Sequence, residues 1–172
     1  IYINTFSKSL TSTIRISYMV LPEHLANEFY RRLSFYSCTV STFEQYTLAR
    51  FISEGYFEKH INRMRIRYKQ KKDLILKEMK RCGLLKLAKI DAEDAGLHFL
   101  LRVCGPVPAE KITRRAAENG VRVTGLSAYY HTAPVNPQTA FVISYSEIPD
   151  ACITEAVNRL AKAVTAAVKE ER

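Results

Sequence analysis

The sequence predicts an α/β sandwich, a small antiparallel or mixed sheet covered by helices, with two further strands at the amino end. Two observations indicate this fold. After residue 84, apolar and amphipathic segments follow in the order strand, strand, helix, strand, strand, helix. The connection between the first two of these strands is too short for a crossover, so they should pair antiparallel. Helices with one apolar side then cover one face of the sheet.

The first third of the chain is predicted to begin with two strands and a helix. Apolar, β-branched residues at 1–4 and 14–21 indicate strands on either side of a polar loop. Pro22 suits the start of a helix that extends to about Leu33. A polar and aromatic connector follows the helix.

Two more helices precede the sandwich. One is expected over 42–53, with Thr42 as its cap and Gln45 as the capping-box partner. The other is a long helix over 56–81, which Gly83 ends. Apolar residues recur on it at helical spacing and predict core packing: Phe57, Ile61, Met64, Tyr68, Ile75 and Met79.

The sandwich itself is predicted from alternating patterns in the second half of the chain. The expected strands are 87–90, 97–103, 121–124 and 140–145. The expected helices are 108–119 and 149–169.

Positive charge is concentrated in one segment. Between residues 57 and 89 there are twelve Lys and Arg against three acids, a difference of nine that equals the net charge of the whole chain. Such a segment either keeps a helix face solvated or binds a polyanion such as nucleic acid.

Composition excludes several classes of protein. No apolar run reaches the roughly 18 residues of a membrane span, so no membrane partner is expected. The four cysteines are widely spaced without a CxxC pair, so we expect no metal site and buried thiols in a cytoplasmic protein. A start in mid-strand without Met is typical of a piece of a longer protein.

The polar loop carries the strongest chemical signal. It holds Thr5, Ser7 and Lys8, and Arg15 follows seven residues after the lysine. Hydroxyls and a guanidinium bind phosphate, and an amine can form a bond to an aldehyde carbon. The stretch TFSKSLTSTIRISYMVLP resembles the Schiff-base lysine region of fold-type I pyridoxal-phosphate enzymes, the aspartate-aminotransferase-like superfamily.

Two further stretches resemble one branch of that superfamily. They are QYTLARFISEGYFEKHINRMRIR at 45–67 and AGLHFLL at 95–101, both similar to the MocR (GabR-like) group of GntR-family transcription regulators. That group fuses a winged helix-turn-helix to an aminotransferase-like domain. The resemblance implies a remnant of the large cofactor domain over 1–40 and the small carboxy-terminal domain over 41–172.

The resemblance also implies roles for individual residues. Lys8 would be the Schiff-base lysine and would bind the cofactor, pyridoxal 5′-phosphate, and Thr5, Ser7 and Arg15 would bind its phosphate. Weaker candidates for the substrate or effector are His98, Arg122 and Tyr129, with Tyr130 and His131 beside the last. Each has an ordinary alternative as a core histidine, a solvent arginine or a loop aromatic.

One position departs from the pattern. Aminotransferases commonly carry an arginine that grips the substrate carboxylate in the strand that matches AFVISYS, and here Val142 stands in its place. Valine cannot form a bidentate clamp. Enzymatic turnover by this chain is therefore left open.

Three functions follow for the intact protein. It would be a regulator whose aminotransferase-like domain senses an amine or amino acid, acts as a homodimer and binds DNA through a winged helix-turn-helix outside this chain. Alternatively, it would be a true aminotransferase, or a basic module that binds through residues 57–89. Because strand edges pair readily, we also expect strands 1–4 and 14–21 to be disordered, rearranged or paired with a second copy.

Overall fold

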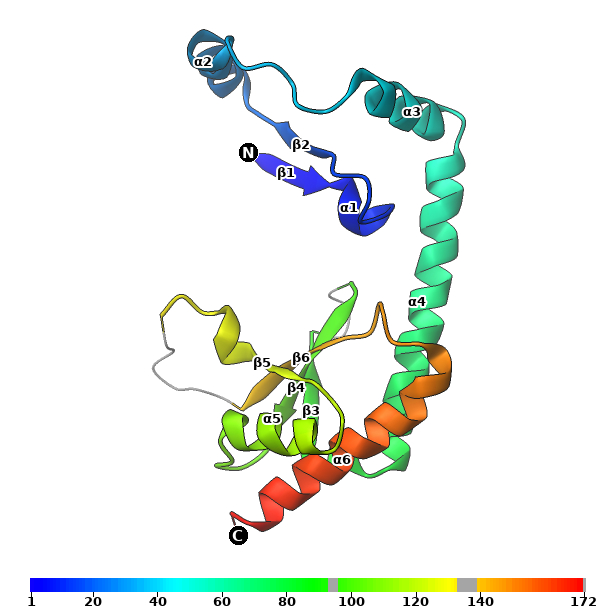
Figure 1. The fold of residues 1–172 in the computed structure, drawn as a ribbon, viewed down its shortest axis with the longest axis vertical. Helices are drawn as coiled ribbons and strands as arrows, with labels where there is room; N and C mark the ends of the chain where they lie inside the picture. Colours follow the sequence, from blue (N-terminus) through cyan, green and yellow to red (C-terminus); the bar gives the residue numbers. More distant parts are fainter. Residues whose placement is uncertain (93–95, 133–138, 172) are drawn as a thin grey trace. The chain divides into compact units, whose positions relative to one another are not determined.

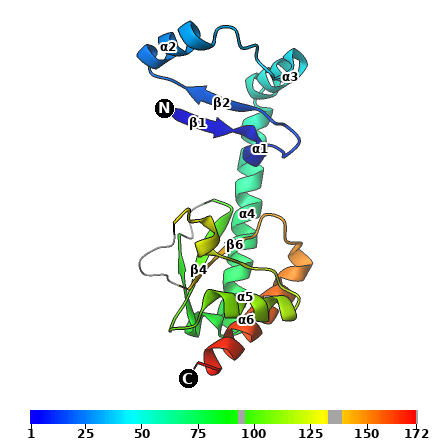
Figure 2. The same cartoon turned by 60° about the vertical axis from the view of Figure 1, so that its left-hand side comes forward.

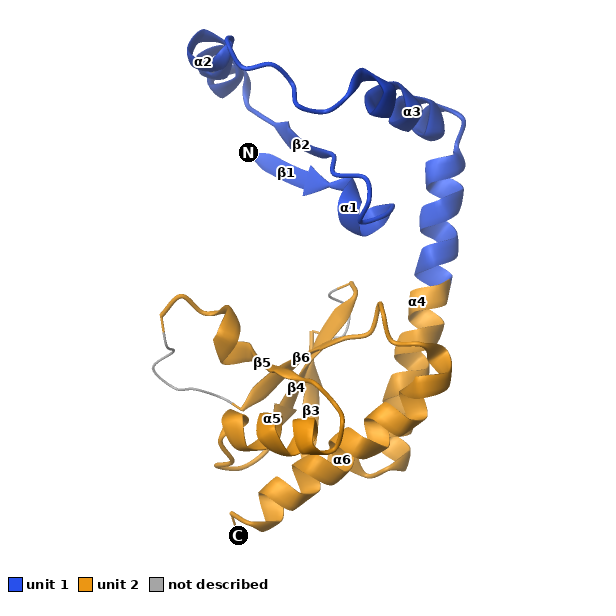
Figure 3. Cartoon of the chain, viewed as in Figure 1, with its two compact units in different colours: residues 1–66 blue, residues 67–172 orange. Residues whose placement is uncertain are grey.

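The chain forms two compact units in a computed structural model that describes residues 1–92, 96–132 and 139–171. Unit 1 comprises residues 1–66 and unit 2 residues 67–172 (Figure 3). The division falls within the long helix, whereas the resemblance places a domain boundary at 40/41, which stays a prediction. Ala95, the first residue of the AGLHFLL stretch, lies outside the described residues.

Unit 1 starts with a hairpin. Strand β1 (Tyr2–Thr5) pairs antiparallel with β2 (Ser17–Val20), and the short helix α1 (Phe6–Ser9) is part of the connection at the end of the hairpin (Figure 1). The two predicted strands are confirmed, although the second is shorter than expected. They pair with each other, and the pairing of their outer edges with a second copy stays a prediction.

Two helices follow the hairpin. Helix α2 (Glu23–Leu33) and helix α3 (Thr42–Ser53) have the predicted bounds. The cap of α3 differs from the prediction, because the Ser41 hydroxyl, not Thr42, accepts from the Glu44 N–H at 3.2 Å. The N-cap is therefore one residue earlier than expected.

Helix α4 (Tyr56–Arg81) is the longest element and confirms the predicted helix. Its carboxy-terminal half packs into the core of unit 2 through Ile75 and Met79. Gly83 follows it at φ 78°, a left-handed conformation that glycine adopts without strain.

Unit 2 is the predicted α/β sandwich. Its sheet is antiparallel with the strand order β3-β4-β6-β5, formed by β3 (Ala88–Asp91), β4 (His98–Val103), β6 (Ala140–Ser144) and β5 (Thr124–Gly125). Helices α5 (Ala109–Glu118) and α6 (Ile153–Lys169) lie side by side (Figures 1 and 2). The described residues of the unit also form three 3₁₀ turns: Leu84–Lys86, Leu126–Tyr129 and Asp150–Cys152.

The fourth predicted strand is shorter and later than expected. The predicted strand includes Val121, but the Val121 N–H donates to the Ala116 carbonyl at 2.9 Å and so closes the end of α5. Only Thr124 and Gly125 pair with β6.

The sheet has one buried and one open face. Phe99, Leu101 and Phe141 alternate onto the face that α4, α5 and α6 cover, and none of the three side chains is exposed. The intervening residues occupy the open face, where His98 lies opposite Ser144, and Leu100 opposite Val142.

Three of the four thiols are exposed, which corrects the expectation of buried cysteines. Cys38, Cys104 and Cys152 are exposed, and Cys82 is half-buried. Each of the exposed residues lies in a loop or at a helix start, where burial in the core is not required.

Candidate functional site

The turn between β1 and β2 is held by its own side chains. Thr5 caps helix α1, because its hydroxyl accepts from the Ser7 N–H at 3.2 Å. The Phe6 N–H donates to the Ile16 carbonyl at 2.9 Å and ties the start of α1 to the strand that follows. The sequence thus folds this segment through local contacts.

Two hydroxyls and a guanidinium meet at this turn. The hydroxyls of Thr5 and Ser7 are 3.1 Å apart, and Arg15 Nη1 donates to Ser7 Oγ over 3.4 Å. Ser7 Oγ in turn donates to the Ile14 carbonyl at 2.9 Å. We call Thr5, Ser7 and Arg15 the hydroxyl–arginine cluster. It places one fixed positive charge beside two donors that can rotate.

Lys8 lies next to this cluster in the sequence. It is exposed on α1, and within the described part of the chain its ammonium has no hydrogen bond or ion pair. The structure therefore brings Thr5, Ser7 and Arg15 together and leaves the Lys8 amine free to react.

The weaker candidates all belong to unit 2 and are not brought together. His98 is exposed at the start of β4, so it is not a core histidine. Tyr129 is 65% exposed, and Tyr130 beside it is also exposed. Arg122 is exposed and lines a pocket of about 120 Å³ at the edge of the sheet. His131 is exposed as well.

Val142 lies near the centre of the open face of the sheet. Its neighbours across the strands are Leu100 and Thr124. The nearby cation, Arg102, is bound to Asp91 by an ion pair of 2.6 Å between Nη2 and Oδ2. This part of the open face therefore offers apolar contacts and a neutralised arginine to a ligand.

Lys71 is a functional group that sequence patterns did not single out. Its side chain is only 6% exposed, and Nζ donates to the Ile148 carbonyl at 2.7 Å and the Ser146 carbonyl at 3.4 Å. Asp150 Oδ1 lies 3.4 Å from the same nitrogen. The signal was available, because Lys71 shares the helical phase of the apolar stripe, three residues after Tyr68 and four before Ile75. We call these contacts the Lys71 clamp.

Tyr145 is a second residue whose role the sequence did not indicate. Its ring is buried and stacks on Phe99 with 6.1 Å between the ring centroids, and its hydroxyl donates to the Gly96 carbonyl. Burial raises the pKa of the Tyr145 phenol. The residue fixes the end of β6 against the start of β4.

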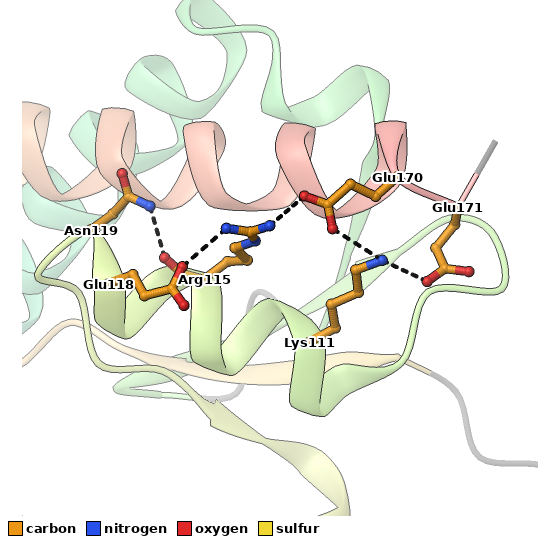
Figure 4. Close-up of polar contacts among 6 residues, drawn as sticks. All are labelled: Lys111, Arg115, Glu118, Asn119, Glu170 and Glu171. Carbon is orange, nitrogen blue, oxygen red and sulfur yellow. Dashed lines mark hydrogen bonds and ion pairs between the residues drawn. The ribbon is translucent and has the colours of Figure 1, made fainter.

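Ion pairs join α5 to the end of α6 (Figure 4). Arg115 Nη2 lies 2.5 Å from Glu170 Oε1, and Lys111 Nζ lies 3.2 Å from Glu170 Oε2 and 2.7 Å from Glu171 Oε1. The hydrogen bond from Lys111 lowers the pKa of the Glu170 carboxyl. The hydrogen bond between Lys111 and Glu171 is the largest cause of the raised pKa of Lys111. This network is structural and lies on the helix side of the sheet.

The described residues contain neither a candidate membrane-spanning helix nor a candidate metal site. None of the helices there is long and apolar enough to cross a membrane. Within the same residues, no three His, Cys, Asp or Glu side chains gather closely enough to hold a metal ion.

Comparison with known proteins places the chain in a family. The family described as aminotransferase class I and II matches residues 1–160, which include the hydroxyl–arginine cluster, Lys8 and the sheet of unit 2. The chain belongs to this family. An aminotransferase of solved structure, the α-aminoadipate aminotransferase LysN from Thermus thermophilus, shows the same fold, with a TM-score of 0.83 and 20% identity over 98% of this chain and 42% of LysN.

The relatives of this chain include transcription regulators. It is 36% identical over 160 residues to YdeL, an uncharacterized HTH-type transcriptional regulator of Bacillus subtilis, covering 93% of the chain and 34% of YdeL. It is 34% identical over 166 residues to the probable rhizopine catabolism regulatory protein MocR of Rhizobium meliloti, covering 96% of the chain and 33% of MocR. The resemblance to this branch is confirmed, and the chain spans about a third of the length of both regulators.

The aminotransferase family implies the use of pyridoxal phosphate, and LysN was solved with N-(5′-phosphopyridoxyl)-L-leucine. The hydroxyl–arginine cluster fits the phosphate of this cofactor, because a guanidinium and two hydroxyls can donate hydrogen bonds to phosphate oxygens. The exposed Lys8 amine beside it fits an aldehyde.

Proposed function

We propose that this chain is part of a pyridoxal-phosphate-binding, aminotransferase-like domain that senses an effector in a GntR/MocR-type transcription regulator. The observation that carries the proposal is the hydroxyl–arginine cluster beside Lys8, within a chain related to HTH-type regulators. In the longer protein, a winged helix-turn-helix outside this chain binds DNA. That protein is a cytoplasmic homodimer.

The residues of unit 1 have separate tasks in this proposal. Arg15 supplies the positive charge for the phosphate, and Thr5 and Ser7 turn their hydroxyls toward it. Lys8 presents a free amine to the aldehyde carbon. When bound, pyridoxal phosphate supplies the electron-withdrawing ring on which amines react.

An amine effector competes with Lys8 for the same aldehyde. With the effector bound, Lys8 would be left as a free amine, and the conformational equilibrium of the domain would shift and bias DNA binding. His98, Arg122 and Tyr129 are the residues of unit 2 that we assign to effector contacts. All three are exposed and therefore accessible to a ligand.

A second candidate function is amino-acid transamination in a longer aminotransferase, favoured by the family match and by the fold of LysN. Val142 speaks against it, since the open face of the sheet has no arginine there to grip a carboxylate. The two functions differ in turnover. A regulator binds the effector amine without releasing a keto product, whereas a transaminase releases one at each cycle.

The test uses the longer protein with pyridoxal phosphate added. Its bound cofactor should give a visible absorbance band that Lys8→Ala abolishes. Lys162→Ala is the matched control, because Lys162 is also exposed and has no ion pair within the described residues. A band that persists unchanged in Lys8→Ala would remove Lys8 from its assigned role.

A further inference from the structure

Helix α4 carries a large share of the net positive charge of the protein. It has ten Lys and Arg against three acids, a difference of seven, whereas the entire chain has a net charge of +9. Six of these cations are exposed and form neither an ion pair nor a cation–π contact with any described residue: Arg63, Arg65, Arg67, Lys69, Lys77 and Lys80. A polyanion could therefore bind them without breaking existing pairs.

The charges in the unit 2 part of α4 lie away from the core. Tyr68, Ile75 and Met79 define the core side of the helix, with Met79 1% exposed. Arg67, Lys77 and Lys80 have other helical phases, and all three are exposed. Lys71 is the cation that turns inward, where the clamp holds it. The exposed cations make a basic face, which we define by Arg67, Lys69, Lys77 and Lys80.

The basic face suits phosphates better than a membrane. An interfacial helix inserts an apolar side into the lipid, but the apolar side of α4 between residues 67 and 81 is packed in the core of unit 2. No large apolar residue among 67–81 is exposed, and the structure describes all of this range. Binding must therefore be electrostatic, and the partner must bring closely spaced negative charges.

We propose that the basic face of α4 binds the phosphate backbone of duplex DNA without reading its sequence. The choice of DNA among polyanions rests on the proposed function, because a regulator works beside DNA. Duplex DNA carries one negative charge per roughly 1.7 Å of its axis, so a helix of this length meets several phosphates. Lysine and arginine contacts to phosphates carry no sequence information.

The test measures binding of the 172-residue chain to a short labelled duplex of arbitrary sequence by fluorescence anisotropy, over a series of salt concentrations. The logarithm of the affinity should fall linearly with the logarithm of the salt concentration. The triple variant Arg67→Ala, Lys77→Ala, Lys80→Ala should bind more weakly. Its slope should be smaller in magnitude by about 2.7, which is about 0.9 for each lost phosphate contact.

A matched triple variant shows whether weaker binding comes from loss of the basic face or only from the lower net charge. Arg114→Ala, Lys162→Ala, Lys169→Ala removes the same one arginine and two lysines from exposed positions on α5 and α6. It should retain the affinity and slope of the parent chain. Equal loss in the two triples would overturn the proposal, provided that circular dichroism shows both folded; alanine is a strong helix former, so helicity should persist.

Two further experiments test whether the partner is DNA or a membrane, and whether DNA binding depends on the cofactor site. Vesicles of phosphatidylcholine and phosphatidylserine should not bind the chain, and α4-dependent binding to vesicles without binding to the duplex would overturn the proposal. Lys8→Ala should bind the duplex as the parent does. Failure of the cofactor test and failure of the DNA test are thus distinguishable.

Discussion

Arg15 donates a hydrogen bond to the hydroxyl of Ser7 across 3.4 Å, although eight residues separate them in the sequence. The hairpin that pairs Thr5 with Ser17 returns the chain and makes this contact possible. The arginine is exposed and retains most of its donors for a ligand.

Arg15→Ala should weaken the binding of pyridoxal phosphate by the longer protein. A hydrogen bond to a charged group contributes about 1.5–3 kcal/mol, so the dissociation constant should rise by roughly 10- to 100-fold. Arg15→Lys retains the positive charge but loses the planar guanidinium with its paired donors. Its dissociation constant should therefore lie between those of the parent and of Arg15→Ala. Titration with the cofactor, followed by absorbance, measures the change. An unchanged dissociation constant in Arg15→Ala would exclude this residue from phosphate binding.

Lys71→Met should destabilise the protein, because the carbonyls of Ser146 and Ile148 lose their buried donor. The expected loss in the free energy of unfolding is about 1–3 kcal/mol. Lys69→Met, two residues earlier at an exposed position, should change it by no more than about 0.5 kcal/mol. Urea unfolding of both variants makes the comparison. Equal stabilities would show that the Lys71 clamp contributes nothing.

The network between α5 and α6 should make stability depend on pH. The pKa of Glu170 is lowered in the folded state. Its contribution to the free energy of unfolding is therefore complete above the pKa that Glu170 has in the unfolded state, and is lost as the pH falls through its folded-state pKa. The pKa of Lys111 is raised, so its contribution is lost as pH rises through the folded value. Thermal unfolding at acidic pH should show a smaller pH effect in Glu170→Gln than in the parent. Glu147→Gln, at an exposed position without an ion pair among the described residues, should leave the profile unchanged.

Gly83→Ala should destabilise the turn after α4. A Cβ atom at this position would meet nothing within 4 Å, so the cost comes from the backbone angle of φ 78°. The left-handed conformation costs a residue with a Cβ about 1–2 kcal/mol. Gly125→Ala is the control, since Gly125 has a φ of −63° and its Cβ contacts would be ordinary. Thermal unfolding of both variants tests the difference, and equal midpoints would contradict this explanation.

The sequence predicted features that depend on nearby residues. The bounds of α2, α3 and α4 and the order of strands follow from local patterns, and so does the loop that holds Thr5 and Ser7. The predicted cap of α3, Thr42, is one residue later than the observed cap, because Ser41 with Glu44 and Thr42 with Gln45 have the same spacing. Spacing alone cannot choose between them.

Features that join distant segments were harder to predict. The Lys71 clamp links residues 75 and 77 positions apart, and a lysine within a basic helix looks like its exposed neighbours. The strand predicted at 121–124 failed for a similar reason. Its first valine completes the end of α5, and only the contacts of β6 decide where pairing begins.

The scarcity of buried side chains in unit 1 has a consequence for its dynamics. Among residues 1–66, all of which the structure describes, only Ile16 and Leu48 are buried, whereas unit 2 contains the continuous hydrophobic core. Few apolar contacts protect the backbone amides of the hairpin, of α2 and of α3. In this chain their hydrogens should exchange with deuterated solvent long before those of β4 and α6, which open only when the whole of unit 2 unfolds.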